Sequence, residues 1–390
     1  MTYNKPSILA TFADQNVLIS MSYQPKVALV HDDFVQQGGA ENLFAEIAQI
    51  YPNAPIYTSL VDWNKPPMGI DRNRVRPSFM QRIPFAAKFY KLLLSLYPLA
   101  FESFNLSAFD VVISSTTRFA KGVVTPPDTI HICYLNSIPR FLWHTDHKKS
   151  YLPSSLESIF RPIINWLKRW DMAAASRVDF FIANSQNVKT QIKKVYNRNS
   201  QVIYPFADTD FFKPPKIHNW RLKSQKYYLI VSRLVRWKKI EIAIRAANNL
   251  GINLFVIGEG PDRSRLKHFA GKSTKFIGKI SKEELRQLYQ NAQALIVTQE
   301  EDFGIVTVEA QACGLPVIAY DHGGQKEIIK NGLTGLFFPS QSTKALEDAI
   351  NASSAVKWNL AEIVKNGQRF SKKQFVKNLK AKVKEYASQK

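Results

Sequence analysis

The sequence predicts an α/β protein made of two doubly wound, Rossmann-like domains that face a central cleft. Short apolar runs of strand length alternate with helical segments, and this alternation occurs in two separate blocks. The length of 390 residues also exceeds what one ordinary hydrophobic core organises. Because ligands bind at the carboxyl ends of the strands in open parallel sheets, we expect the functional site between the two domains.

The first block begins at Lys26–His31, whose apolar centre Val27–Val30 is typical of a buried parallel strand. The glycine pair Gly38 and Gly39 then leads into a helix that we expect from Ala40 to about Tyr51. Further strands of this block are predicted at Val111–Ser114, His131–Leu135 and Phe180–Ala183.

The second block repeats the alternation. Its predicted strands are Tyr227–Ser232, Leu254–Ile257, Lys275–Ile277, Ala294–Val297 and Pro316–Ala319, and its predicted helices include Ile240–Asn249, Lys282–Ala292 and Val306–Ala312. Pro214 and Pro215 stop regular structure near the break between the blocks. We therefore expect an N-terminal extension over 1–24, domains over 25–207 and 208–370, and a basic helix over 371–390 that could cross back to the first domain.

The charge balance indicates a polyanionic partner. The chain carries 53 Lys and Arg against 31 Asp and Glu, a formal net charge of +22, which favours nucleic acid, an anionic membrane face or phosphorylated substrates. No run approaches the roughly 20 apolar residues that span a bilayer, and residues 1–24 lack the pattern of a signal peptide. Cys133 and Cys313 lie in apolar runs, so we expect buried thiols in a reducing compartment.

The most informative segment is Glu300–Ala310, in which seven residues separate the carboxylates of Glu301 and Glu309. Gly304 opens a helix whose first free N–H groups can meet a phosphate or a sugar oxygen. Because carboxylates accept paired hydrogen bonds from neighbouring hydroxyls, one Glu suits a hexose and the other a ribose. The alternative interpretation is an acidic loop followed by a charge that the helix dipole favours.

Two cations follow the predicted strand Tyr227–Ser232. Arg233 and Lys238 lie five residues apart in a loop at the carboxyl end of that strand, where a planar guanidinium and a compact ammonium group suit a diphosphate. A solvated basic turn is the alternative in so basic a chain.

From Lys26 to about Ile350 the sequence resembles the large retaining glycosyltransferase family with the GT-B fold, which includes bacterial mannosyltransferases of polysaccharide assembly. The stretches that carry the resemblance are GGAEN, SRLVRWKK, VIGEGPDRSRL, FIGKISKEEL, EEDFGIVTVEAQACGLPVIAY and NGLTGLFF. The Glu-x7-Glu block combined with the Arg-Leu-Val-x-x-Lys loop is the most specific part of this resemblance.

The resemblance implies roles for four side chains. Arg233 and Lys238 would neutralise the diphosphate leaving group, Glu301 would contact the donor hexose, and Glu309 would hold the ribose hydroxyls.

It also implies a set of backbone contacts. N–H groups at Phe303, Gly304 and Ile305 would meet the hexose and phosphate, and backbone near Lys279 and Ile280 would pack on the base. Gly38 and Gly39 would let the first loop approach the donor and acceptor closely.

One position departs from the family pattern. Close relatives carry a His that contacts the donor sugar, and this His aligns with Asn136 in the stretch Asn136–Trp143. An amide can replace an imidazole as a neutral hydrogen-bond partner, but it cannot carry a proton. We therefore expect Asn136 to bind the donor without acid–base work, while Arg140 keeps the family's basic residue.

The resemblance thus implies a metal-independent, retaining glycosyltransferase that uses a nucleotide-sugar as co-substrate and no further cofactor. Arg233 and Lys238 already supply the positive charge that Mg²⁺ would bring. Asp208–Asp210 and Asp32–Asp33 are short acidic patterns that we do not expect to bind a metal.

The donor is expected to be GDP-mannose, with UDP-sugars as the alternative. A GT-B-fold epimerase and a phosphorylase are rivals, of which the Glu-x7-Glu block argues against the first and the short length against the second. A basic protein that binds membrane or nucleic acid would explain the charge but not the arrangement of the four side chains.

Two segments suggest an anionic membrane as a partner. One is Arg72–Phe104, where an apolar run accompanies the cations Arg72, Arg74, Arg76, Arg82, Lys88 and Lys91, and the other is Ile159–Trp170. The alternative is that both are ordinary helices with apolar faces in the core. We expect a cytoplasmic enzyme, peripheral on the inner face of the cytoplasmic membrane, with a glycan or lipid-linked acceptor and no nucleic acid partner.

Overall fold

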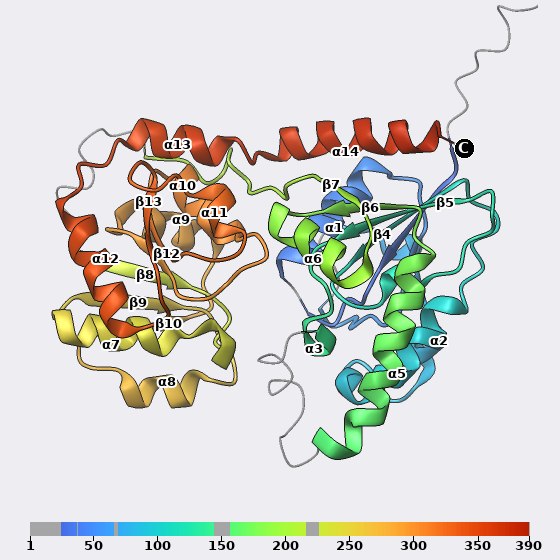
Figure 1. Ribbon diagram of the computed structural model, residues 1–390, viewed down its shortest axis with the longest axis horizontal. Coiled ribbons are helices and arrows are strands. Elements are labelled where there is room, and N and C mark those ends of the chain that lie inside the picture. The colour runs from blue at the N-terminus through green and yellow to red at the C-terminus, as the bar shows by residue number, and fades with distance from the viewer. Residues whose placement is uncertain (1–24, 37, 66–68, 144–156, 216–225, 390) are drawn as a thin grey trace, which may run out of the picture.

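The computed structural model describes residues 25–389 except 37, 66–68, 144–156 and 216–225. Two α/β domains lie side by side, and the last helices of the chain run across the top of both (Figure 1). The N-terminal extension expected over 1–24 lies outside the described residues.

The first domain is built on one parallel sheet. Its strands are β1 (Val27–His31), β2 (Ile56–Thr58), β3 (Val75–Pro77), β4 (Val111–Thr116), β5 (Ile130–Leu135), β6 (Phe180–Ala183) and β7 (Ser200–Val202). The strand order is β3-β2-β1-β4-β5-β6-β7, and every neighbouring pair is parallel. The order therefore reverses between β1 and β4, the kind of switch point at which open sheets bind ligands.

Helices and 3₁₀ turns connect these strands. They are α1 (Gly39–Ile50), η1 (Arg72–Arg74), η2 (Phe79–Arg82), η3 (Tyr90–Leu96), α2 (Tyr97–Glu102), η4 (Ala120–Gly122), α3 (Arg140–Trp143), α5 (Glu157–Ser176) and α6 (Gln186–Tyr196).

The second domain repeats the design with six parallel strands. They are β8 (Tyr227–Val231), β9 (Asn253–Ile257), β10 (Thr274–Gly278), β11 (Leu295–Val297), β12 (Val317–Tyr320) and β13 (Gly335–Phe338), in the order β10-β9-β8-β11-β12-β13. The connections are η7 (Arg236–Lys238), α7 (Ile240–Leu250), α8 (Arg263–Phe269), α9 (Lys282–Asn291), α10 (Ile305–Ala312), α11 (Gln325–Ile328), α12 (Thr343–Ala355) and α13 (Leu360–Gln368). The predicted pair of doubly wound domains is confirmed.

Apolar layers on both faces of each sheet explain why the strands are continuous hydrophobic runs. In β1, Leu29 belongs to the core on one face, whereas its neighbours Ala28 and Val30 belong to the core on the other. Successive strand residues point to opposite faces, so a strand buried on both sides must be apolar throughout.

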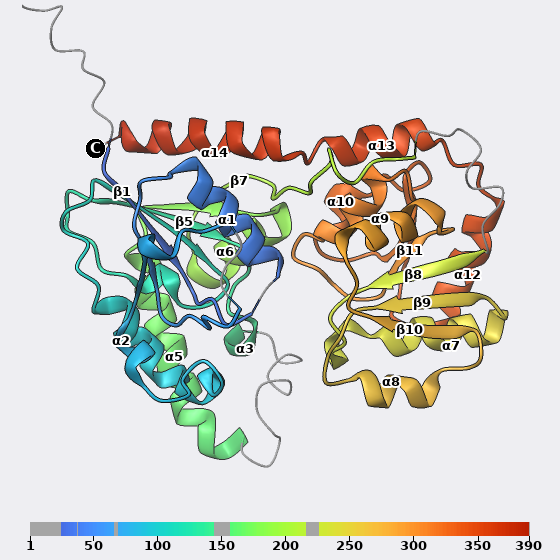
Figure 2. The same cartoon turned by 180° about the vertical axis from the view of Figure 1, so that it is seen from behind.

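The last helix, α14 (Lys372–Ala387), packs on the first domain rather than the second (Figure 2). Phe375 and Leu379 are buried in the core of the first domain, and the ring of Tyr386 stacks on Phe180 at 4.0 Å. The chain thus passes between the domains twice, and an isolated β-bridge between Ala207 and Ser371 joins the two crossings.

The segment Arg72–Phe104 is not one amphipathic helix, because it forms η1, β3, η2, η3 and α2 in turn. Its first part serves the fold: the Arg74 guanidinium donates to the carbonyl oxygens of Ala54, Ala48 and Tyr51 at 2.9, 3.1 and 2.7 Å. Among the described residues, no helix is both long and apolar enough to cross a membrane.

Candidate functional site

The loops that follow β8 and β11 bring Lys238 and Glu301 into direct contact. Lys238 Nζ bonds Glu301 Oε1, and Gln299 Nε2 donates to the same oxygen at 2.6 Å. The two loops are also joined through Thr298 Oγ1, which donates to the carbonyl oxygen of Lys238 at 2.7 Å. Burial lowers the pKa of Lys238, and the Glu301 carboxylate opposes that shift. Lys238, expected at the diphosphate, and Glu301, expected at the hexose, are therefore in direct contact.

Gly304, three residues after Glu301, occupies a backbone position that only glycine fits. Its φ of +111° lies in a region that side chains rarely adopt, and an added Cβ would lie 2.3 Å from Gln325 Nε2. The preceding Phe303 is buried against the rings of Tyr204 and Phe370, at 5.7 and 5.3 Å between centroids. The start of α10, with Ile305, is consequently held rigidly beside Glu301.

Glu309 lies within α10, one helical turn after its first residue. Tyr289, which is buried in α9, donates its hydroxyl to Glu309 Oε2 at 3.2 Å. Burial raises the pKa of Glu309 to about 7, against the lowering effect of the Tyr289 hydrogen bond and of Lys282. The carboxyl group therefore titrates in the physiological range, which is where a change of ligand environment alters its charge most easily.

The glycine loop of the first domain approaches the start of α10. A Cβ added to Gly39 would lie 3.1 Å from Ile305 Cδ1, and Gln36 Oε1 accepts a hydrogen bond from Arg233 Nη1 at 3.4 Å. Gly38 directly precedes α1 with extended backbone. These contacts bring the expected residues of the first domain against those of the second.

Asn136 follows β5 and is buried, with 9% of its surface exposed. Its Nδ2 donates to Ser115 Oγ at 3.1 Å and more weakly to the carbonyl oxygen of Thr116 at 3.4 Å. The amide N–H groups are thus engaged with the end of β4.

An interdomain ion pair that sequence reasoning missed lies next to these residues. Arg140 Nη2 contacts Asp302 Oδ2 at 2.6 Å, and its Nε donates to the same oxygen at 3.1 Å. The guanidinium also lies over the Trp237 ring, 5.0 Å from its centroid. Arg140 of the first domain therefore contacts both loops that carry Lys238 and Glu301. The available signals were the position of Arg140 after a predicted strand and the basic residue that the resembled family carries there.

A second interdomain contact lies at α6. Glu327 accepts hydrogen bonds from the backbone N–H groups of Gln186 at 2.7 Å and Asn187 at 2.9 Å. A carboxylate at the first turn of a helix is favoured by the helix dipole, so Glu327 of the second domain stabilises a helix of the first.

The acidic pair after β1 has a structural role. Asp32 accepts hydrogen bonds from Thr116 Oγ1 and from the backbone N–H groups of Thr117, Phe119 and Ala120, all at 2.7–2.8 Å. Asp33 pairs with Arg118 at 2.6 Å. Within the described ranges, no three His, Cys, Asp or Glu side chains gather as a metal site would require.

Lys279 and Ile280 directly follow β10, two strands away from β8 in the sheet. They lie at the same carboxyl edge of the sheet as Lys238 and Glu301 but farther along it.

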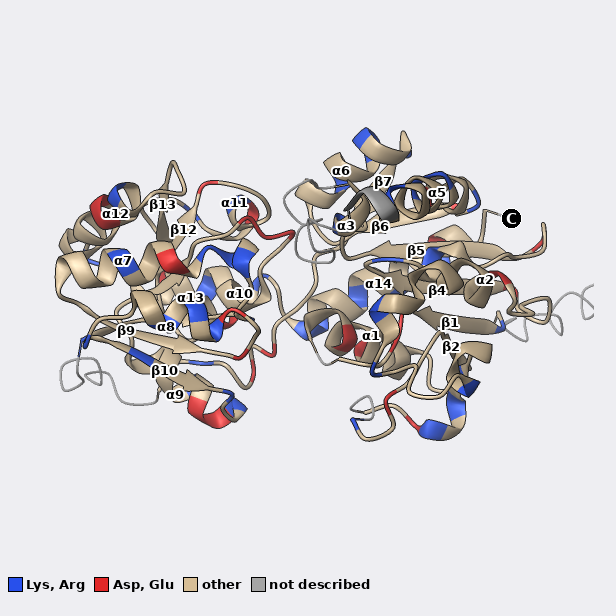
Figure 3. Ribbon diagram, turned by 90° about the horizontal axis from the view of Figure 1, so that it is seen from below, with Lys and Arg blue, Asp and Glu red and all other residues tan. Residues whose placement is uncertain are grey.

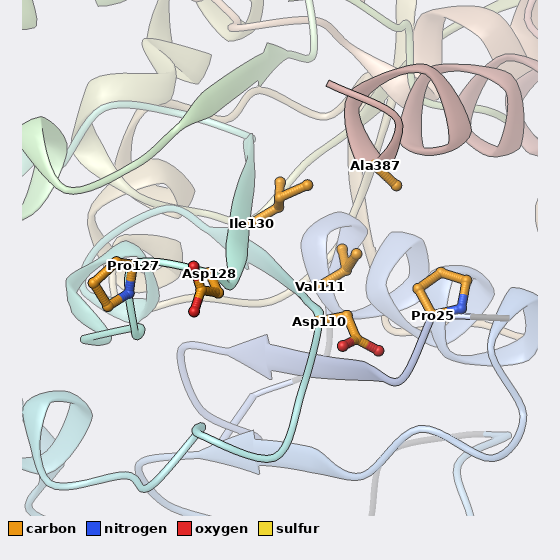
Figure 4. A pocket seen from close by; sticks show the side chains of 7 residues that line it. All are labelled: Pro25, Asp110, Val111, Pro127, Asp128, Ile130 and Ala387. Atoms are coloured by element: carbon orange, nitrogen blue, oxygen red, sulfur yellow. The ribbon is translucent and has the colours of Figure 1, made fainter. Parts of the chain in front are cut away.

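A pocket of ≈ 360 Å³ lies at the opposite edge of the first sheet (Figure 4). Its lining includes Asp110, Ile130 and Ala387, near the amino ends of β4 and β5 and the end of α14. It therefore has no part in the site at the carboxyl ends.

Comparisons with known proteins show which proteins this chain is similar to. Residues 213–370 match the family model of glycosyl transferases group 1. A D-inositol 3-phosphate glycosyltransferase of Mycobacteroides abscessus is 28% identical over 202 positions, with 46% of this chain and 45% of that protein covered. An uncharacterized glycosyltransferase of Methanocaldococcus jannaschii is 24% identical over 322 positions, covering 77% of this chain and 78% of the relative. The chain thus spans about half the length of the Mycobacteroides abscessus protein and of one further curated relative.

Solved structures match over nearly the whole chain. Sucrose-phosphate synthase from Thermosynechococcus elongatus has a TM-score of 0.70 at 17% identity, with 93% of this chain and 99% of that one covered. Anabaena HepE in complex with UDP has a TM-score of 0.68 at 19% identity, with coverage of 92% and 100%. The chain therefore has the GT-B fold, and its residues 213–370 are similar to the glycosyl transferases group 1 family.

Proposed function

We propose that this protein is a retaining, metal-independent glycosyltransferase that moves a hexose from a nucleotide-sugar to a glycan or lipid-linked acceptor. The observation that carries the proposal is the meeting of Lys238 and Glu301 at the start of α10, with Glu309 one turn further along the same helix. One cation for a diphosphate, one carboxylate for a hexose and one for a ribose are the groups that such a donor needs.

Each group has a step to serve. The acceptor hydroxyl oxygen would bond to the anomeric carbon while the bond from that carbon to the diphosphate oxygen breaks. Lys238 and Arg233 would stabilise the negative charge that grows on the departing diphosphate, which is where preorganised charge lowers a barrier most. The diphosphate oxygen would then take the acceptor's proton.

Retention by attack on the same face is proposed because the sequence resemblance places no carboxylate by motif as a nucleophile on the acceptor side. The proposed route therefore uses no covalent intermediate. In this structure Glu301 is bonded to Lys238 and Asp302 to Arg140.

GDP-mannose is the proposed donor on the strength of the sequence resemblance. A UDP-hexose is the second candidate, because the structurally similar Anabaena HepE has been solved with UDP-glucose. The TM-score between this chain and that complex is 0.64. For the acceptor, the name of the Mycobacteroides abscessus relative, D-inositol 3-phosphate glycosyltransferase, indicates a phosphorylated alcohol as the acceptor of that protein. A phosphorylated or lipid-linked acceptor at an anionic membrane would also suit a chain of net charge +22.

A thermal-shift panel tests the donor, since a ligand that binds only the folded state raises its melting temperature. We expect one of GDP-mannose, UDP-glucose, UDP-galactose and UDP-N-acetylglucosamine to raise it in wild type and much less in Glu309→Gln. With the preferred donor, NMR of the first product should show the anomeric configuration retained. An inverted product would contradict the proposed mechanism.

A further inference from the structure

The segment that runs from η2 through η3 exposes large apolar side chains that ordinary folding would bury. Phe85 is 76% exposed, Leu92 75% and Phe89 48%. Phe85 also has a φ of +57°, a left-handed conformation that is strained for a bulky residue. Exposed apolar residues at one place, one of them held out by strained backbone, indicate a binding surface.

The apolar side chains on the inner side of this segment are already buried. Met80, Ala86 and Tyr97 are buried in the core on that face of the first sheet, and residues such as Leu93 pack against it. The outward residues are therefore a second apolar side, not a core left incomplete.

Helix α5 adds a matching face beside these turns (Figures 1 and 2). Leu167 and Trp170 on its inner side join the same core, whereas Trp166 is 46% and Ile163 37% exposed. Arg161 lines a shallow pocket together with Trp166. The turns and the helix thus share a core and both present apolar side chains outward.

The charges on these two segments have one sign. Residues 79–96 and 159–170 contain no Asp or Glu, and their six cations are Arg82, Lys88, Lys91, Arg161, Lys168 and Arg169. Figure 3 shows basic residues along α5. Cations around exposed aliphatic and aromatic side chains fit an anionic bilayer, whose headgroups meet the charge and whose acyl region takes the apolar groups. Aliphatic tips such as Leu92 and Ile163 would gain nothing from the stacked bases of a nucleic acid.

This surface borders the interdomain site. The Arg118 guanidinium, which pairs with Asp33 after β1, lies 6.0 Å from the centroid of the Tyr90 ring in η3. Turn η3 therefore lies near the loop after β1, in which Gln36 accepts a hydrogen bond from Arg233 of the second domain. An acceptor headgroup at the membrane surface would need to travel little to reach the donor.

We propose that Phe79–Leu96 and the outer face of α5 over Arg161–Trp170 together form a docking lobe that inserts into an anionic lipid bilayer beside the interdomain site. The role of the lobe in presenting a lipid-linked acceptor rests on the proposed function, whereas its membrane binding does not. The cations Arg72, Arg74 and Arg76 lie outside the lobe, and Arg74 serves the fold as described above.

The test compares two double variants of the full chain by sedimentation with phosphatidylcholine vesicles, with and without phosphatidylglycerol. Phe85→Ser with Leu92→Ser removes the exposed tips of the lobe. Val124→Ser with Leu333→Ser, at positions 45% and 62% exposed elsewhere, is the matched control. Equal melting temperatures would show that neither pair disturbs the fold.

Wild type and control should bind the anionic vesicles and dissociate as salt rises. The lobe variant should bind them about tenfold more weakly, or weaker still. The idea is overturned if wild type ignores anionic vesicles or if the lobe variant binds them like the control. It is equally overturned if the lobe variant instead abolishes a concentration-dependent dimer, because the surface would then bind protein. Donor hydrolysis in solution is measured in parallel. Its absence would contradict the proposed function and would leave the result on membrane binding unchanged.

Discussion

Lys238 Nζ bonds Glu301 Oε1 where the loops after β8 and β11 meet, so a cation and a carboxylate expected on one substrate hold each other in this structure. A nucleotide-sugar would have to separate them, with the diphosphate replacing Glu301 beside Lys238. The ion pair therefore keeps a buried charge compensated until a substrate takes its place.

Lys238→Ala should lower turnover about 100-fold or more, because this charge would act on the departing diphosphate. Arg236→Ala is the matched control, since Arg236 is an exposed cation of the same turn η7. Steady-state kinetics with the preferred donor measures both. An equal loss in the two variants would mean that general positive charge, not Lys238, matters.

Glu309→Gln should fold normally and bind the nucleotide-sugar about tenfold more weakly, because a charge-assisted hydrogen bond contributes roughly 1.5–3 kcal/mol. Glu283→Gln, an exposed residue in the first turn of α9, should bind like wild type. Calorimetric titration at pH 8 checks this. Unchanged affinity in Glu309→Gln would remove Glu309 from the donor site.

The affinity for the nucleotide-sugar should rise as pH increases through about 7, because burial raises the pKa of Glu309 to about 7 and the ionised carboxylate accepts ribose hydroxyls better. Nucleotide-sugars suit the measurement because their diphosphate does not titrate there. The Glu309→Gln variant should show no such rise. A parallel rise in both proteins would assign the titration elsewhere.

The same shift sets a stability change with a definite sign. The folded-state pKa lies above the usual 4.5, so between these pH values the folded protein binds more protons than the unfolded chain. The contribution of Glu309 to stability is therefore complete below about pH 4.5 and is lost as pH rises through about 7. Melting temperatures of wild type should fall relative to Glu309→Gln across this window.

Arg140→Ala should lower kcat/KM at least as much as Asp302→Ala, because Arg140 contacts both Asp302 and Trp237. The double variant should be little worse than Arg140→Ala alone, since residues in contact show coupled effects. Strict additivity of the two losses would mean that the ion pair does not act as a unit. Arg140→Lys, which keeps the charge but not the fork, should recover only part of the activity.

Regular elements were predictable where the apolar pattern is long. The strand Phe180–Ala183 has the predicted bounds, the basic helix expected over 371–390 spans Lys372–Ala387, and most other predicted elements differ by one or two residues. The strands β2, β3, β7 and β13 were missed, because runs of three or four residues give only a weak pattern. The sequence did not reveal that Arg72–Phe104 is divided among η1, β3, η2, η3 and α2, because composition alone does not show a 3₁₀ path.

The site was predictable in its residues but not in its pairings. Glu301, Glu309, Arg233 and Lys238 stand in local motifs whose spacing can be read from the sequence. The Arg140–Asp302 contact joins residues 162 positions apart, and Glu327 reaches α6 over 140 positions. Such contacts depend on how two domains meet, which no local pattern encodes.

The most direct measurement is the release of nucleoside diphosphate from each of the four nucleotide-sugars, by wild type and Lys238→Ala, with and without EDTA. Wild type should release it from one donor, faster with an acceptor present and equally well in EDTA, and Lys238→Ala should release about 100-fold less. Wild-type release that disappears in EDTA and returns with Mn²⁺ or Mg²⁺ would contradict the metal-free mechanism. No release from any of the four donors, or equal release by Lys238→Ala, would contradict sugar transfer at this site.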